Sequence, residues 1–91
     1  MPKKKDAFRE GVGKRLRTLR LARGFDTIRA FAQDLNVEED RYDAWEKGKA
    51  LIPPQVAADL RARFGVTSDW LYFGDTSGLS RVLYDDLKKV A

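Results

Sequence analysis

The most informative part of the sequence is a central run that reads Phe31-Ala32-Gln33-Asp34-Leu35-Asn36-Val37-Glu38-Glu39-Asp40-Arg41-Tyr42-Asp43-Ala44-Trp45-Glu46-Lys47-Gly48-Lys49. Phe31 and Leu35 are four residues apart, so they share one face of a helix. Asn36 stands where this helix must stop, because asparagine adopts the left-handed backbone conformation more readily than most residues with a side chain. Tyr42 and Trp45 are three residues apart and share the inner face of a second helix. The run therefore predicts two short helices joined by a tight turn.

The second of these helices has a polar outer face and a basic exit. Glu39, Asp40, Asp43 and Ala44 turn toward solvent or a partner, and Lys47-Gly48-Lys49 follows the helix. This spacing is that of a helix-turn-helix, a unit that lays its second helix in the major groove of DNA.

Glycines, prolines and capping residues predict the remaining elements on either side. We expect a first helix that starts near Phe8 or Val12, a second capped by Asp26 or Thr27, a fifth capped by Thr67 or Ser68, and an amphipathic helix over residues 79–90. The fifth helix should carry Trp70, Leu71 and Phe73. No strand-like alternation occurs, so the expected fold is all-α: a compact bundle of about five helices plus a C-terminal amphipathic helix.

The expected organisation is a flexible basic arm over residues 1–7, a helix-turn-helix domain over 8–74 and a C-terminal extension over 75–91. The apolar stripe of the extension should pack against the body or against a second copy. One core should contain Val12, Leu16, Leu19, Phe31, Leu35, Val37, Trp45, Val56, Leu60, Phe64, Val66 and Leu71.

The composition narrows the possible classes of function. The 91 residues are 43% hydrophobic and 35% charged, with no cysteine and no histidine. Disulfides, thiolate chemistry and almost all transition-metal sites are therefore excluded, and the commonest acid–base catalyst is missing. No apolar run approaches the length of a membrane span, and no apolar stretch follows the charged opening residues as in a signal peptide. We expect a single cytoplasmic domain that is not an enzyme, with no catalytic residue, no metal, no cofactor and no membrane contact.

The charge is distributed unevenly along the chain. Residues 1–29 contain ten Lys or Arg and three acidic residues, whereas residues 30–91 contain eight and eleven. A basic first third attached to a mildly acidic body suggests contact with a polyanion, although a solvated charged helix surface would look the same.

Several motifs occur in a fixed order: Val12-Gly13-Lys14-Arg15-Leu16-Arg17, Leu35-Asn36-Val37, Tyr42, Trp45-Glu46-Lys47-Gly48-Lys49, and Phe64-Gly65-Val66-Thr67-Ser68-Asp69-Trp70-Leu71 with Gly74. Together, over roughly residues 11–74, they resemble the XRE/Cro-type phage-repressor helix-turn-helix family. The resemblance implies a lambda-repressor-like bundle that binds a palindromic operator in double-stranded DNA as a homodimer.

The resemblance also implies which residues meet DNA. The base-facing positions fall on Glu38, Glu39, Asp40, Arg41 and Ala44. The phosphate-contacting positions fall at the start of the second helix, on Thr27, Ile28 and Arg29, and in the loop Lys47-Gly48-Lys49. Lys3, Lys4 and Lys5 could form an arm that contacts the duplex, or a solubilising tail.

The acidity of the third helix leaves three readings open. Glu38, Glu39 and Asp40 could stabilise the helix against its own dipole, accept hydrogen bonds from cytosine, or repel DNA and dock a basic protein. Arg41 could contact a guanine edge or neutralise Glu38 or Asp40. The sequence favours a small transcriptional regulator, associated with the nucleoid when bound to DNA. The alternative is a helix-turn-helix fold reused for protein–protein interaction, as in an antirepressor or an antitoxin-like protein.

Overall fold

The computed structural model describes residues 4–90, with side chains from residue 7 onward. Within that range the chain forms six helices and no strand, which confirms the all-α prediction. The helices are α1 (Lys4–Ala22), α2 (Ile28–Leu35), α3 (Glu39–Glu46), α4 (Pro54–Phe64), α5 (Ser68–Phe73) and α6 (Arg81–Val90). Among these described helices, none combines the length and the apolar character that a bilayer-spanning segment requires.

Local chemistry sets the helix ends as the sequence predicts. Thr27 and Thr67 precede α2 and α5, and their side-chain oxygens accept hydrogen bonds from the backbone N–H groups of Ala30 (3.1 Å) and Trp70 (3.0 Å). Asn36 ends α2 in the left-handed conformation, with φ 58° and ψ 47°. Gly65 ends α4 in the same conformation.

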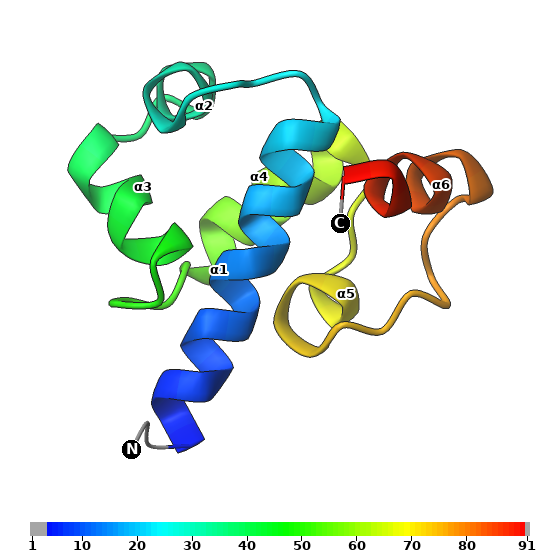
Figure 1. The fold of residues 1–91 in the computed structure, drawn as a ribbon, viewed down its shortest axis with the longest axis horizontal. Coiled ribbons are helices and arrows are strands. Elements are labelled where there is room, and N and C mark those ends of the chain that lie inside the picture. Colours follow the sequence, from blue (N-terminus) through cyan, green and yellow to red (C-terminus); the bar gives the residue numbers. More distant parts are fainter. Residues whose placement is uncertain (1–3, 91) are drawn as a thin grey trace.

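Helix α1 runs through the middle of the fold (Figure 1). It contacts α3 on one side and α5 and α6 on the other. Gly13 permits the approach to α3, because a Cβ atom at this position would lie 2.3 Å from the carbonyl oxygen of Glu46. The molecule therefore has an α2–α3 side and an α5–α6 side, separated by α1.

The buried core connects the two sides. Nine of the twelve predicted core residues are buried, whereas Val37, Val56 and Phe64 are only half-buried against it. Both tryptophans are buried. The core also contains residues outside that prediction, namely Ala32, Tyr42, Ile52, Ala57, Trp70, Leu83 and Leu87.

Helix α6 packs against α1 within a single chain. The Ser80 hydroxyl accepts a hydrogen bond from the Leu83 backbone N–H (3.1 Å), so the helix begins at Arg81 rather than at Leu79. Leu83 and Leu87 are 5% exposed, whereas Val90 is 40% exposed. Most of the apolar stripe of this extension is thus covered by the protein's own body.

The first helix starts earlier than expected. Helix α1 begins at Lys4 rather than near Phe8 or Val12, so residues 4–7 are helical. The reason is composition: Lys5, Ala7, Phe8 and Arg9 include no helix breaker. Residues 1–3 lie outside the described residues.

Phe73 lies in α5, as expected, and is 73% exposed. It is the last residue of this six-residue helix, whose buried positions are occupied by Trp70 and Leu71. Its ring instead contacts that of Phe8 on α1, with ring centroids 5.9 Å apart.

Candidate nucleic-acid interface

Helices α2 and α3 form the predicted two-helix unit. The turn between them is closed by backbone hydrogen bonds from Asn36 to the Gln33 carbonyl (3.1 Å) and from Val37 to the Ala32 carbonyl (2.9 Å). The ring of Phe31 on α2 meets that of Tyr42 on α3 edge to face, with centroids 5.4 Å apart. The two helices are therefore held together as one rigid element.

A buried ion pair between Arg20 and Glu46 links α1 to α3. The Arg20 guanidinium donates two hydrogen bonds of 3.0 Å to the two carboxylate oxygens of Glu46, and a third of 2.9 Å to the Phe25 carbonyl. The two side chains are 7% and 6% exposed. The hydrogen bond to Glu46 raises the pKa of Arg20. A bidentate pair of this kind fixes both the position and the orientation of the C-terminal end of α3.

The Tyr42 hydroxyl lies in the same buried region. Within the described chain it has no hydrogen-bond partner of good geometry. Burial raises the pKa of Tyr42 well above that of a free tyrosine, and the carboxylate of Glu46 adds to the effect. The inner face of α3 is thus held by aromatic packing and by one ion pair.

Most of the expected base-facing residues lie on the outer surface of α3. Glu38, Glu39, Asp40 and Arg41 are exposed, whereas Ala44 is only half-buried. Glu38 is the residue before the helix, and Glu39 and Asp40 occupy its first turn, where carboxylates interact favourably with the helix dipole. This part of the surface is open and strongly acidic.

Three cations on or beside α3 contact other side chains of the protein. Arg29 on α2 lies 3.7 Å from a carboxylate oxygen of Glu39. Lys47 donates a 2.6 Å hydrogen bond to Asp43, which raises the pKa of Lys47. The guanidinium of Arg41 stacks 5.3 Å from the centre of the Trp45 ring, so it forms a cation–π contact and not an ion pair with Glu38 or Asp40, which was one of the two roles considered for it.

The loop after α3 lies beside α1. Gly48 has a φ of 75°, and a Cβ atom there would lie 2.9 Å from the side chain of Glu10. Lys49 is exposed next to it. Thr27 and Ile28 stand at the start of α2, with Thr27 acting as its cap. Lys4 and Lys5 belong to α1, but their side chains, and all of Lys3, lie outside the described residues.

Three arginines of the basic first third have roles inside the fold that the charge count did not predict. Arg20 pairs with Glu46, Arg23 pairs with Asp86 on α6, and Arg15 donates hydrogen bonds to the carbonyls of Leu71 (2.7 Å) and Tyr72 (3.0 Å) at the end of α5. Burial lowers the pKa of Arg15. The basic surface is therefore smaller than the sequence suggested.

The buried position of one of these arginines, Arg20, could have been predicted from the sequence. Arg20 follows Leu16 by four residues and directly follows Leu19, so it lies on the apolar stripe of α1. A cation on such a stripe must be paired if it is buried. Its partner Glu46, however, is 26 residues away and belongs to another helix.

Comparisons of the chain with protein-family models, with curated proteins and with solved structures gave no match. The function is therefore inferred from the motifs of the chain and from the geometry of α2 and α3.

Proposed function

We propose that the protein binds double-stranded DNA by placing α3 in the major groove, and that it acts as a small transcriptional regulator. The observation that carries this proposal is the pairing of α2 and α3 across the Asn36 turn, with the first turn of α3 exposed. A helix fixed on one face and open on the other can enter a groove about as wide as itself.

The residues divide into two roles. Glu38, Glu39, Asp40 and Arg41, with Ala44 beside them, read base edges; a carboxylate can accept a hydrogen bond from cytosine, and Arg41 can leave the Trp45 ring for a guanine. Thr27 and Arg29, together with Lys47 and Lys49 and the lysines at positions 3–5, contact phosphates and position the helix.

We further propose a homodimer on a palindromic operator in the cytoplasm, at the nucleoid. Because Leu83 and Leu87 are buried within one chain, the dimer must use other apolar surface. We assign that surface to the exposed pair Phe8 and Phe73. Phe73→Ser should then shift the sedimentation of the protein toward the monomer, whereas Val82→Ser, an equally exposed site on α6, should leave it unchanged.

The first experiment is a binding selection on random DNA followed by sequencing, repeated over a range of salt concentrations. An enriched palindromic motif and a steep fall of affinity with salt would support the proposal. Weak binding without a motif would contradict it.

The second experiment distinguishes residues that contact phosphates from residues that recognise bases. Replacing Lys47 and Lys49 by alanine should weaken binding to all sequences alike and reduce the salt slope by about 1 for each lost contact. The matched control replaces Lys88 and Lys89 on α6, which changes the charge equally on the opposite side of α1 (Figure 1). An equal loss in both variants would mean that only net charge matters.

A second candidate function is docking of a basic protein on α3. It is favoured by the acidic first turn and by the engagement of Arg29 with Glu39 and of Lys47 with Asp43. Glu39→Ala and Asp40→Ala distinguish the two. If these carboxylates read bases, preference at one or two base pairs changes by about 1–3 kcal/mol each. If they dock a protein, DNA binding tightens with no change of preference.

A further inference from the structure

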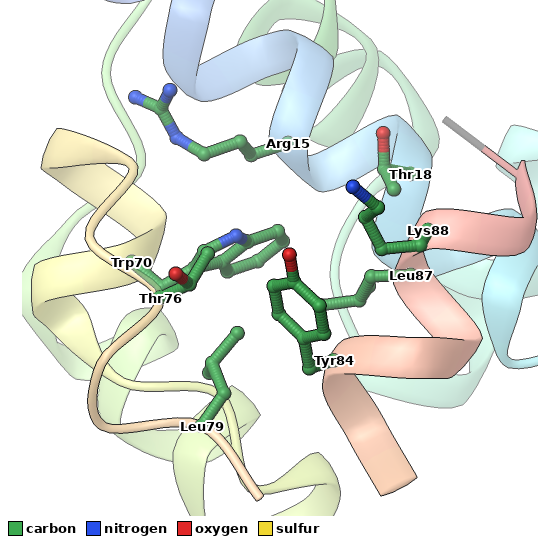
Figure 2. A pocket seen from close by; sticks show the side chains of 8 residues that line it. All are labelled: Arg15, Thr18, Trp70, Thr76, Leu79, Tyr84, Leu87 and Lys88. Atoms are coloured by element: carbon green, nitrogen blue, oxygen red, sulfur yellow. The ribbon is translucent and has the colours of Figure 1, made fainter. Parts of the chain in front are cut away.

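A cleft opens on the α5–α6 side of the molecule, between α1, α5, the connection after Gly74 and α6 (Figure 2). Its volume is about 170 Å³, and its walls are formed mainly by Trp70, Leu79, Tyr84 and Leu87. An apolar cavity of roughly 150 Å³ is large enough to hold a benzene ring. The cleft therefore has room for one small aromatic ring.

Three hydrogen-bond donors lie at the end of the cleft nearest α1. They are the indole N–H of Trp70, the hydroxyl of Tyr84 and the ammonium group of Lys88, while Leu79 lies at the other end (Figure 2). The Lys88 nitrogen is 5.5 Å from the centre of the Tyr84 ring. Among residues 7–90, whose side chains are described, none of these three groups has a hydrogen bond or an ion pair with another residue. They are free to receive an acceptor group from a ligand.

The charge around the cleft has one sign. Of the eight described residues that line it, Arg15 and Lys88 are cationic and none is acidic. The Arg15 guanidinium is bound to the carbonyls of Leu71 and Tyr72 and is turned away from Lys88, so Lys88 is the cation that faces the cleft (Figure 2). An anion in the cleft would meet attractive groups only.

We propose that this cleft binds a small aromatic monocarboxylate. The ring lies between Trp70, Tyr84 and Leu79, and the carboxylate faces Lys88 and the two neutral donors. An apolar pocket with a few convergent polar groups at one end is the usual form of a small-molecule site. A neutral ring would make the apolar contacts but leave Lys88 unpaired, and a ring bearing an amine would be repelled by Lys88.

Such a ligand touches α1, α5 and α6 at once, so it binds only the folded arrangement of the three. Its binding therefore raises the melting temperature by mass action. This site is separate from α3, and the inference stands whether or not the protein binds DNA.

The test uses benzoate as the probe, with benzyl alcohol and benzylamine as ligands of similar size and different charge. The two tryptophans report by NMR: the indole N–H resonance of Trp70 should move saturably with benzoate, while that of Trp45, on the α3 side, should stay in place. Affinity should fall in the order benzoate, benzyl alcohol, benzylamine. The absence of a saturable shift at Trp70 with benzoate up to about 10 mM would overturn the proposal.

Matched variants test whether Lys88 contacts the carboxylate of the ligand. Lys88→Met should weaken benzoate about two- to fivefold and leave benzyl alcohol unchanged, as expected for one partly exposed charge pair. Lys89→Met removes the same charge from the next position and should change neither. Leu79→Trp should fill the cleft and abolish binding of both ligands, with folding checked by circular dichroism. Equal weakening by Lys88→Met and Lys89→Met, or unchanged benzoate binding in Leu79→Trp, would contradict the assignment.

Discussion

The contacts that α1 makes with α3 differ in kind from those that it makes with α6. Toward α3, the contact depends on the Arg20–Glu46 ion pair and on the close approach at Gly13. Toward α6, it depends mainly on the buried side chains of Leu83 and Leu87, with the partly exposed Arg23–Asp86 ion pair beside them, and it leaves a cleft of about 170 Å³. Hydrogen-bonded ion pairs are directional, whereas apolar contacts are not. The difference indicates that the orientation of α3 is fixed tightly, while the α6 side tolerates an unfilled space.

The largest effect is expected from breaking the ion pair on the α3 side. Glu46→Ala leaves the Arg20 charge buried and unpaired, which should lower the free energy of unfolding by about 3–5 kcal/mol. The double variant Arg20→Met with Glu46→Leu should recover most of that loss, because no charge then remains buried. Urea unfolding measures both. A loss below about 1 kcal/mol in Glu46→Ala would mean that water reaches the pair and that α3 is held by packing alone.

The second prediction compares one leucine from each side. Leu35 on α2 and Leu87 on α6 are 6% and 5% exposed, so replacement of either by alanine should cost about 2–5 kcal/mol. Thermal unfolding should show one cooperative transition at a lower temperature in each variant. An unchanged melting temperature for Leu87→Ala alone would show that α6 is not an integral part of the fold.

The third prediction concerns pH and the buried Tyr42 hydroxyl. Burial holds the pKa of Tyr42 above that of an unfolded tyrosine, which is about 10. The unfolded state therefore loses this proton first as the pH rises. The associated stability is intact below about pH 10 and falls above it by up to about 1.4 kcal/mol per pH unit. Tyr42→Phe should lose less stability than the parent between about pH 9 and pH 11.

The smallest effect is expected from the ion pair on the α6 side. The side chains of Arg23 and Asp86 are 28% and 30% exposed, so solvent screens their attraction. Asp86→Ala should cost about 0.2–1 kcal/mol, well below the loss in Glu46→Ala. Asp85→Ala, which removes a more exposed carboxylate of the same helix, should have no measurable effect. A loss in Asp86→Ala as large as that in Glu46→Ala would remove the proposed contrast between the two sides.

Residues that act on their immediate neighbours were predicted well. Asn36 and the capping threonines set helix ends through bonds to groups a few residues away, so their effect can be read from the sequence. The exposed positions on the first turn of α3 follow from the same periodicity. The partners of Arg29 and Arg41 do not, because side-chain pairing depends on how α2 and α3 meet.

The sequence by itself determined the all-α class, the helix-turn-helix spacing and most of the core, because helix ends and apolar stripes are local properties of the chain. Only the tertiary structure decided which cations are buried, where Phe73 points and that a cleft lies beside α6. Arg15, for example, meets the carbonyl of Leu71 across 56 residues of sequence. Contacts over such separations depend on the packing of whole helices, which no local pattern of residues specifies.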